Sequence, residues 1–578
     1  MSSKPIEGPG RHEPPASPTR KKMVGWFDPG QLVRTGIQVL VSNLLGARAD
    51  YRLLESLGPT SEIFDYSADE EIWLDYVADL GDGWNGTYAI ASLLARPGLD
   101  LPGATGAAPL TTRRGAILVM GGDEVYPAAS PQGYREGTLA AYQAAMRRSE
   151  APNPSLFAIP GNHDWYDGLV SFSRLFCQAA AGGGRWFGGW KTRQNRSYFA
   201  LQLPHRWWFW GVDTQLESDI DAYQLEYFCS VARNLQKGDR VIVATAEPHW
   251  IYGNIYDPDL HHNLAHLEKF VIRNAGGVAK LILAGDIHHY RRHQPEGEEG
   301  TQLITSGGGG AFLHSTLGPK VDEIVVPGPP TERYTLAAQY PDQATSKRLL
   351  LRNFLFPVWN PFFGVVTGAA YLAIGWLLRG PLAAATGVWW GRATLYYGLL
   401  GVLKSPGTLL LVLLTILAFV LFTETHSRWY RRIAGTAHGL THLTAILFLT
   451  ASATRLVGRT LAVDPDSVTG LLITGACVFA GGYALGSVIM GVYLYISLRI
   501  FGRHANEAFS ALRIPDYKNF LRLHIGRDGA LTVFPIGVDR VPRKWTSVPG
   551  ASDTEPRYAP AEGQPLEPHL IEPPIVVR

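Results

Sequence analysis

The sequence predicts a layered α/β domain followed by an α-helical membrane domain. Over residues 60–345, short apolar or β-branched runs alternate with helical stretches, which is typical of a layered α/β domain. After about residue 350 the chain contains long runs without charged side chains, and charged residues make up only 18% of the sequence. Soluble domains contain about 25% charged residues. Part of this chain is therefore expected not to face water.

Net charge and cysteine usage exclude several classes of protein. The 578 residues carry 52 basic and 50 acidic side chains, a formal net charge of +2. This balance gives no bulk attraction for nucleic acid, so no nucleic acid binding is expected, and it excludes an acidic disordered chain. Cys177, Cys229 and Cys477 lie far apart, which excludes a disulfide framework and favours a reducing compartment.

The N-terminal region lacks the features of a signal peptide. Residues 1–25 are rich in Pro, Ser, Lys and Arg, so we predict a disordered tail. No apolar stretch of signal-peptide type follows, and the next segment is expected to stay in the cytosol. Over residues 31–45, apolar side chains recur with the spacing of an amphipathic helix. Packing on the following domain is the favoured interpretation, and a position on a membrane surface is the alternative.

Residues 26–345 are predicted to form one α/β domain with its core over residues 60–320. Five of its β-like runs end directly in a polar cluster that could bind metal. The runs cover residues 73–78, 116–120, 156–159, 207–212, 240–246, 281–284 and 302–304. The C-terminal ends of strands in an α/β sheet meet at one edge, where ligand sites form. We therefore expect the five clusters to lie close together.

A transmembrane domain is predicted over residues 353–500. At 1.5 Å per residue, four uncharged runs approach or exceed a hydrocarbon core of about 30 Å. They predict spans over residues 360–379, 405–423, 433–454 and 470–498. The stretch 386–403 is less apolar and carries Arg392, so we predict an interfacial or re-entrant segment there.

The positions of basic residues support four spans. Lys and Arg gather at residues 347–352, 428–432 and 499–503. Short cytoplasmic loops carry an excess of these residues, and all three clusters share one side only if residues 386–403 do not cross. We therefore predict a multi-pass protein of the cell membrane with the α/β domain and both termini in the cytoplasm. A fifth span is the alternative.

The chain returns to soluble character after the last span. Over residues 505–545, two β-like runs flank the turn Arg527-Asp528-Gly529, which predicts a hairpin. Because an isolated hairpin is marginally stable in water, it is expected to dock on the α/β domain. Residues 546–578 are rich in Pro, Glu and Ser, and we predict a disordered tail.

The five polar clusters contain the side chains needed for a metal centre. As candidate donors they offer three aspartates, an asparagine, two histidines and a tyrosine, with one histidine left over. The clusters are Asp79-Leu80-Gly81, Gly122-Asp123-Glu124-Val125-Tyr126, Gly161-Asn162-His163-Asp164, Ala246-Glu247-Pro248-His249 and Gly285-Asp286-Ile287-His288. Oxygen donors mixed with imidazole suit Mn, Fe or Zn, and this number of donors is enough for two ions. Two such ions can activate water and neutralise a phosphoryl group.

The order of these motifs resembles the calcineurin-like metallophosphoesterases, and the tyrosine variant resembles their purple acid phosphatase branch. The resemblance covers residues 60–320, about half of the chain. It implies a four-layer α/β/β/α sandwich, here fused to the membrane domain. It also implies a first metal held by Asp79, Asp123 and His288, with Tyr126 as a possible fourth ligand.

The same resemblance implies roles for the remaining residues. Asp123 would bridge to a second metal held by Asn162, His249 and Asp286. His163 would be the leaving-group acid or a phosphate contact, oriented by Asp164. This is acid chemistry by a group with a near-neutral reference pKa.

Two departures from the family pattern affect the site. Asp286 replaces the first histidine of the last motif and adds a negative charge, which favours a harder ion. Ala246 replaces a valine, which is a packing change. Two assignments stay open: Tyr126 either binds the metal or packs beside it, and Asp82 takes the place of Asp79 if the loop register differs.

Other residues have both a functional and a plain structural interpretation. The run Gly307–Gly310 either lets backbone amides approach a phosphate or forms a turn at a strand end. His314 either lines the cleft or lies outside it. His438 and His442 share one face of the third predicted span. Hydrogen bonding near the membrane interface is the favoured interpretation of this pair, with haem or metal binding as the alternative.

The sequence therefore predicts a membrane-anchored, cytosol-facing phosphoesterase with two metal ions of the Mn, Fe or Zn class. It would hydrolyse a phosphomonoester or phosphodiester by in-line attack of a metal-bound hydroxide. Its expected partners are a phosphorylated small-molecule or lipid substrate and the lipid bilayer. The alternative is a transport or signalling membrane protein whose phosphoesterase-like domain is regulatory and catalytically weak.

Overall fold

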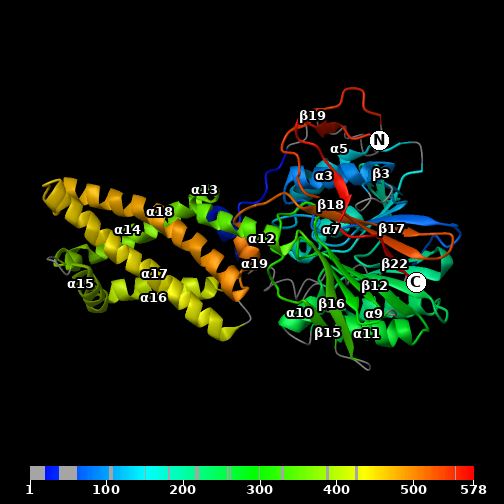
Figure 1. The fold of residues 1–578 in the computed structure, drawn as a ribbon, viewed down its shortest axis with the longest axis horizontal. Coiled ribbons are helices and arrows are strands. Elements are labelled where there is room, and N and C mark those ends of the chain that lie inside the picture. The colour runs from blue at the N-terminus through cyan, green and yellow to red at the C-terminus, as the bar shows by residue number, and fades with distance from the viewer. Residues whose placement is uncertain are drawn as a thin grey trace, which may run out of the picture.

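The computed structural model shows a mixed α/β domain from which a long helical bundle extends to one side (Figure 1). It describes residues 20–34, 36–37, 62–102, 109–149, 152–179, 183–214, 220–256, 260, 262–297, 300–326, 331–385, 390–423, 427–552 and 555–578.

Two nine-stranded sheets form the frame of the α/β domain. The order of the first sheet is β1 (Phe64–Asp65), β9 (Phe199–Leu203), β10 (Trp207–Gly211), β11 (Arg240–Ala244), β12 (Val278–Ala284), β14 (Gln302–Ser306), β13 (Tyr290–Pro295), β16 (Glu332–Tyr340) and β15 (Glu323–Val326). The order of the second is β21 (Pro568–Leu570), β18 (Leu531–Val538), β17 (Lys518–Ile525), β2 (Ile72–Val77), β5 (Ile117–Met120), β6 (Ser155–Ala158), β8 (Trp190–Thr192) and β7 (Trp186–Phe187), with β22 (Ile575–Val577) also paired to β18. Two small ribbons pair β3 (Gly98–Leu101) with β4 (Leu110–Arg113) and β19 (Trp545–Ser547) with β20 (Tyr558–Pro560).

Short helices connect these strands. They are α3 (Trp84–Ala95), α4 (Pro131–Tyr134), η2 (Arg135–Leu139), α5 (Ala140–Ala145), α6 (Asn162–Trp165), α7 (Val170–Phe176), η3 (Pro204–Arg206), α9 (Ala222–Ala232), α10 (His249–Ile255), α11 (His262–His266) and η5 (Leu267–Arg273).

Three buried clusters hold the domain together. The central one combines side chains of both large sheets, including Leu74 from β2 and Ile242 from β11. A second joins α3, α5 and α7 to the sheet that contains β2, and a third joins α9 and η5 to the sheet that contains β11. Every residue of β5 and β10 is buried, as expected of strands that are covered on both faces. The predicted mixed α/β character is therefore present.

The C-terminal hairpin is part of the second sheet. β17 and β18 pair with each other, and β17 pairs antiparallel with β2. At this seam the buried Arg522 Nε donates to Asp75 Oδ1 over 2.8 Å. The Arg522 guanidinium also donates to the Thr112 hydroxyl. A fully buried ion pair thus links a strand after the membrane domain to the first long strand of the α/β domain.

Arg522→Met should lower the free energy of unfolding of the α/β domain by about 3–5 kcal/mol, because it leaves the Asp75 carboxylate buried and unpaired. Thermal unfolding of the detergent-solubilised full chain measures this loss. The matched control is Arg527→Met, since Arg527 is 73% exposed in its pair with Glu70; its effect should stay within about 0.5 kcal/mol. Equal free energies of unfolding for the two variants would show that the buried ion pair does not stabilise the contact between β17 and β2.

Residues 546–578 were expected to be disordered, and this expectation is wrong for the described part of the tail. β21 and β22 pair with the outer edge of β18, which offers unpaired backbone groups. Glu572 accepts hydrogen bonds from Tyr290 and Arg292 of β13. The tail is held by an edge strand and an ion pair that are distant in the sequence, so its composition alone was misleading.

The predicted disordered tail over residues 1–25 also needs correction at its end. Residues 1–19 lie outside the described residues. Lys21 Nζ donates to the Tyr126 carbonyl over 2.5 Å, and the Val24 amide donates to Asp82 over 2.9 Å. Helical residues follow at 29–34 and 36–37, whereas residues 38–45 of the predicted amphipathic helix lie outside the described part of the chain.

The bundle contains several long apolar helices. Its elements are α12 (Gln343–Leu350), η6 (Leu351–Leu355), α13 (Phe356–Trp359), α14 (Pro361–Ala383), α15 (Trp390–Lys404), α16 (Pro406–Phe422), α17 (Arg428–Arg455), η7 (Leu456–Thr460), α18 (Val468–Phe501) and α19 (Ala505–Ser510). Within the described residues, three helices are long and apolar enough to cross a membrane: Pro361–Ala383, Arg428–Thr460 and Val468–Phe501. A fourth crossing exists if the pair α15 and α16 counts as one span, although the two helices meet at 105°.

The bend between α15 and α16 bears on the predicted spans. α16 has 17 residues, about 26 Å at 1.5 Å per residue, and it covers most of the predicted span 405–423. α15 lies at the end of the bundle away from the α/β domain (Figure 1). Length and composition support three crossings or four. Of the predicted segment 386–403, residues 386–389 lie outside the described part of the chain.

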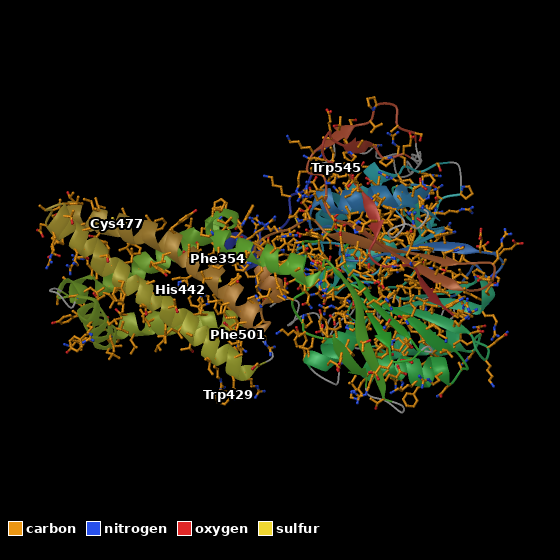
Figure 2. The ribbon with its side chains drawn as sticks, viewed as in Figure 1. Phe354, Trp429, His442, Cys477, Phe501 and Trp545 are labelled. Carbon is orange, nitrogen blue, oxygen red and sulfur yellow. The ribbon has the colours of Figure 1, made fainter. Side chains whose placement is uncertain are left out.

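The two parts of the molecule share one apolar core. Phe356, Met490 and Leu498 of the bundle cluster with Leu313 and Phe509 of the adjoining segments. The start of α14 and the ends of α16 and α18 therefore lie at the end of the bundle that faces the α/β domain. Figure 2 places Cys477 of α18 toward the far end and Phe501 of the same helix near the domain.

Candidate functional site

The predicted ligands follow the ends of strands in both large sheets. Asp79 follows β2 and Asp123 follows β5, which are parallel neighbours. Asp286 and His288 follow β12 of the other sheet. Backbone bonds join these loops: the Asp79 amide donates to the Gly122 carbonyl, and the Asp286 amide donates to both carboxylate oxygens of Asp79 at 3.1 and 2.9 Å. The His163 amide donates to Asp123 Oδ1 over 2.9 Å, and the Gly285 amide donates to the Ala246 carbonyl. The structure thus brings all five clusters together.

Three predicted ligands converge on the hydroxyl oxygen of a fourth, Tyr126. This oxygen lies 2.9 Å from Asp123 Oδ2, 3.2 Å from Asp79 Oδ1 and 2.8 Å from His288 Nε2. Tyr126 is buried, with 1% of its surface exposed. One phenol proton can serve only one of three acceptors. At least two of the three acceptor atoms therefore receive no proton from the Tyr126 hydroxyl.

The His288 ring is oriented so that one lone pair faces this cluster. Nδ1 lies 2.8 Å from the Phe312 carbonyl oxygen, and a carbonyl can only accept, so Nδ1 carries the proton in the neutral ring. Nε2 then directs its lone pair toward Tyr126. The His314 ring stacks on His288 at a centroid distance of 3.8 Å. A carbonyl partner that fixes the tautomer is the usual arrangement of a metal-binding histidine.

The backbone at these positions is strained. Asp79, Asp123, Asp286 and His288 have φ values of 61°, 55°, 69° and 45°, in the left-handed region that side chains with a Cβ adopt rarely. Eleven non-glycine residues in the described part of the chain have positive φ, and these four predicted ligands are among them. Such strain persists where the surroundings enforce it, typically at functional sites.

The carboxylates repel one another in a dry environment. Burial, followed by the charges of Asp123 and Asp286, raises the pKa of Asp79 well above its usual value. Burial, followed by the charges of Asp164 and Asp286, does the same for the pKa of Asp123. For Asp286, burial and then the Glu247 charge raise the pKa to about 7. A cation placed among these groups would favour their ionised forms.

The second predicted ligand set is less closely assembled. Asp286 Oδ2 accepts a short hydrogen bond from the Tyr252 hydroxyl. Asn162 lines the same cavity as Asp123. His249 is buried, and neither of its ring nitrogens has a hydrogen-bond partner among the residues that the structure describes; burial lowers its pKa to about 4. Within the described residues, no hydrogen bond joins Asn162 or His249 to the other predicted ligands.

His163 and Asp164 do not form the predicted pair. His163 Nδ1 donates to the Pro127 carbonyl over 2.7 Å, and this bond orients the ring. Asp164 instead accepts hydrogen bonds from the Gly161 and Glu124 amides and a short one from the Tyr134 hydroxyl. The expectation that Asp164 orients His163 is therefore wrong, because the short helix α6 turns the two side chains to different partners.

Two alternatives left open by the sequence are resolved by hydrogen bonds. Both carboxylate oxygens of Asp82 accept backbone amides, from Val24 and Phe312, so Asp82 holds loops together while Asp79 faces the cluster. The amides of Gly307 and Gly309 donate to backbone carbonyls, which supports the turn interpretation. A Cβ on Gly307 would lie 2.1 Å from Asp79 Oδ2; glycine is therefore needed for this close approach.

Two adjoining cavities reach the cluster. The first, about 750 Å³, is lined by Asp123, Tyr126, Asn162, His163, Asp286, His288 and His314 and continues along α14 and α16. The second, about 490 Å³, shares Asp286, His314 and Glu507 with the first and is also lined by the basic residues Lys320 and Arg503. The cluster is accessible from both.

Sequence reasoning missed several residues that surround the cluster. Trp26 packs edge-on against the rings of Tyr126 and His163 at centroid distances of 6.4 and 5.9 Å. Lys518 is buried and donates to the Ala311 carbonyl, and burial lowers its pKa to about 8. Trp26 follows a proline-rich segment and Lys518 follows the membrane domain, so neither lies near a motif. Tyr252, three residues after His249, was the one with a local signal.

The histidine pair of the bundle is separate from this site. His442 Nδ1 lies 2.9 Å from the Tyr371 hydroxyl, and its Nε2 lies 3.2 Å from His438 Nε2. Figure 2 shows His442 between the two ends of the bundle. These interactions are hydrogen bonds within α17 and to α14, with ring stacking on α16 and α18, as the plain structural interpretation expects.

This chain shows limited similarity to known proteins. No protein-family model matches the chain, and no curated protein matches it. Among solved structures, a purple acid phosphatase from yellow lupin (Lupinus luteus) seeds is similar to 42% of this chain at 15% sequence identity, with a TM-score of 0.25. This chain spans 45% of the lupin chain. Among the described residues, no three His, Cys, Asp or Glu side chains are placed so that they could hold a metal ion as they stand.

Proposed function

We propose that the protein is a membrane-anchored phosphoesterase that uses metal ions to hydrolyse a phosphomonoester or phosphodiester. The observation that carries this proposal is the convergence of Asp79, Asp123 and His288 on the Tyr126 hydroxyl, within 3.2 Å. The α/β domain would then be a four-layer phosphoesterase sandwich. The three basic clusters near the domain-facing end of the bundle support a cytoplasmic domain.

The donor set fits a metal centre. Two carboxylates and an imidazole lone pair surround the Tyr126 phenol oxygen, and mixed oxygen and nitrogen ligands suit Mn, Fe or Zn. These side chains would have to move to coordinate an ion, because no three of the described ones are placed to hold one as they stand. Asp79, Asp123, Tyr126 and His288 would hold one ion. Asp123, Asn162, His249 and Asp286 would hold a second, and the unpartnered nitrogens of buried His249 favour this assignment. Ions bound there would supply a nucleophile from water at neutral pH and neutralise phosphoryl charge.

The other residues of the chain hold and protonate the substrate. Because Nδ1 of His163 is bonded to Pro127, its Nε2 is the ring nitrogen left for the cavity. Burial lowers the pKa of His163 to about 4, but an anionic phosphate beside the ring favours the protonated form. His163 can then give its proton to the leaving oxygen. Tyr126, packed at 4.3 Å from the His163 ring, keeps that ring in place.

A metal reconstitution assay tests the proposal. The detergent-solubilised full chain is treated with chelator, and Mn²⁺, Fe²⁺ or Zn²⁺ is then added before turnover of p-nitrophenyl phosphate and bis(p-nitrophenyl) phosphate is measured. We expect hydrolysis of at least one substrate only after metal is restored. A chain that binds metal but hydrolyses neither substrate would instead support the regulatory alternative. Hydrolysis that is insensitive to chelator would overturn the metal-based proposal.

The raised carboxylate pKa values predict how metal stabilisation changes with pH. An aspartate whose pKa is higher in the folded state contributes stability below its unfolded value of about 4, and this contribution is lost as pH rises through the folded pKa. For Asp286 that value is about 7. The metal-free chain should therefore lose stability toward about pH 8, and bound metal should offset the loss.

Thermal unfolding with and without Mn²⁺ measures this effect. The metal-induced rise in Tm should be larger at about pH 8 than at about pH 5.5, because the ionised carboxylates repel most strongly at the higher pH. Asp286→Asn should reduce the pH dependence of that rise. A rise that is the same at both pH values would contradict the assignment of these carboxylates as ligands.

A further inference from the structure

The larger cavity joins the proposed catalytic cluster to the membrane helices. Its catalytic end contains Asp123, His163 and His288. Its other end is largely apolar and is formed by the start of α14 and the end of α16, where Phe363, Val366, Ala370, Leu414 and Phe419 line it together with the polar residues Thr367 and Thr415. We propose that the substrate is a phosphate ester of a lipid, with its hydrocarbon chain in this apolar part. The inference rests on the proposed phosphoesterase function and specifies its substrate class.

The packing of the bundle explains why space remains between α14 and α16. α14 packs mainly against α18, and α16 packs mainly against α17, so few contacts join α14 to α16 directly. Val366 of α14 and Leu414 of α16 are 49% and 52% exposed although both line the cavity. The cavity can therefore be reached from the side of the bundle. In a bilayer that side faces lipid, and a hydrocarbon chain could enter without crossing water.

The dimensions fit a single alkyl chain. Seven residues separate Phe363 from Ala370, a rise of about 10 Å along α14, which is roughly a third of a hydrocarbon core of about 30 Å. The cavity volume of about 750 Å³ falls within the roughly 300–1,000 Å³ typical of ligand sites. A chain bound there would extend from the catalytic cluster toward the middle of the bundle.

The N-terminal segment contacts both the polar end and the apolar end of the larger cavity. Trp26 packs on Tyr126 and His163. The next residue, Phe27, packs on Phe363 and Phe422 of the membrane helices at centroid distances of 5.9 and 6.4 Å. Adjacent residues thus line the two ends of one cavity. A nucleotide or phosphoprotein substrate offers no long apolar chain for this lining, whereas each methylene of a hydrocarbon chain that is buried from water favours binding.

The smaller, polar cavity offers a site for the polar part of the proposed lipid substrate. Lys320, Arg503 and Glu507 line it, and it meets the larger cavity at Asp286 and His314. A phosphoester between the two cavities would direct its hydrocarbon chain toward α14 and its polar side toward these charged residues. Water would also reach the cluster from this side.

A series of alkyl phosphates tests the inference. For the metal-loaded full chain in detergent, kcat/KM should rise from ethyl to butyl, hexyl and octyl phosphate, by up to about fourfold per buried methylene. The octyl-to-ethyl ratio should exceed about a hundredfold. Hydrolysis of all four esters at similar kcat/KM would overturn the lipid inference while leaving the phosphoesterase proposal intact. If none of the four alkyl esters is hydrolysed and the nitrophenyl esters are not hydrolysed either, the result would count against both the lipid inference and the phosphoesterase proposal.

Two adjacent alanines of α14 provide a matched pair of variants. Ala370 lines the cavity, whereas Ala369 lines a separate groove on the outside of the bundle. Ala370→Trp should lower the octyl-to-ethyl ratio at least tenfold by filling the space for the chain, and Ala369→Trp should leave that ratio unchanged. Partition of the longer esters into detergent affects both variants equally. Equal ratios in the two variants would show that the cavity does not bind the chain.

Photolabelling gives a readout independent of turnover. Octylphosphonate with a diazirine at the chain terminus cannot be hydrolysed, and mass spectrometry locates its attachment. We expect labelled peptides that contain Val366–Ala370 or Leu414–Phe422, with labelling competed by unmodified octylphosphonate and reduced in Ala370→Trp. Labelling confined to the outer groove around Ala373 and Leu472 would overturn the inference.

Discussion

Asp123→Asn is expected to lower metal-dependent phosphoester hydrolysis by at least about 10³-fold, equivalent to about 4 kcal/mol of transition-state stabilisation. Asp123 is the one carboxylate expected to contact both ions, and its Oδ2 lies 2.9 Å from the Tyr126 hydroxyl. An amide has the same shape but lacks the negative charge that holds a cation. Turnover of nitrophenyl esters by the metal-loaded full chain measures the loss.

Asp82→Asn is the matched control for this variant. Asp82 is also buried in a loop after β2, but its carboxylate accepts only the Val24 and Phe312 amides. Its replacement should reduce thermal stability, whereas bound metal and turnover per folded molecule should fall less than about tenfold. Loss of metal in Asp82→Asn with retention in Asp123→Asn would reverse the assignment of ligands.

His163→Ala is expected to slow hydrolysis by about 10²–10⁴-fold for an ester with a poor leaving group. The proton that His163 provides matters most for an alkoxide, which is a strong base. A p-nitrophenolate leaves without protonation, so the loss for p-nitrophenyl phosphate should be at least tenfold smaller. The dependence of kcat on the leaving-group pKa, compared between wild type and variant, measures this difference.

Asp164→Asn separates acid catalysis from support of the loop. Asp164 contacts the Gly161 and Glu124 amides and not the His163 ring. Its replacement should slow alkyl and nitrophenyl esters by the same factor, because it disturbs the loop that carries His163 without removing the proton donor. Equal losses for the two esters in His163→Ala would contradict the assignment of His163 as the acid.

The positions of the main ligands were predictable because they follow from a general property of sheets. Asp79 and Asp123 come directly after parallel strands, and such ends share an edge. Asp286 and His288 were expected near them for the same reason, although these follow β12 of the first sheet, whereas Asp79 and Asp123 follow strands of the second. The position of Tyr126, three residues after Asp123, was also predictable. The motifs left open whether its side chain binds a metal or packs beside it, and the structure places its hydroxyl among the other three predicted ligands.

Partners distant in the sequence explain the predictions that failed. His163 is oriented by the carbonyl of Pro127, and no sequence pattern distinguishes that carbonyl from others. The final strands depend on the free edge of β18, which a proline-rich composition does not indicate. Trp26 lies against the site because Lys21 and Val24 bond to its loops. In each case tertiary contacts outweighed local composition.

The helical bundle was also only partly predictable from the sequence. Uncharged runs identified α14, α17 and α18 well, since a long apolar helix has few alternatives. The stretch that includes Arg392 was ambiguous in the sequence, and the 105° bend beside it depends on how α15 meets its neighbours. The cavity between α14 and α16 was not predictable at all, because it arises from the pairing of helices rather than from any one of them.

The most direct test of the central claim is the metal content of the purified full chain, determined by mass spectrometry together with turnover in the same samples. The account predicts that turnover rises in proportion to bound Mn, Fe or Zn, reaching its maximum near two ions per chain. It also predicts that the variant Asp79→Asn/Asp123→Asn binds little metal and is inactive. Full turnover without bound metal, or full metal binding by that variant, would contradict it.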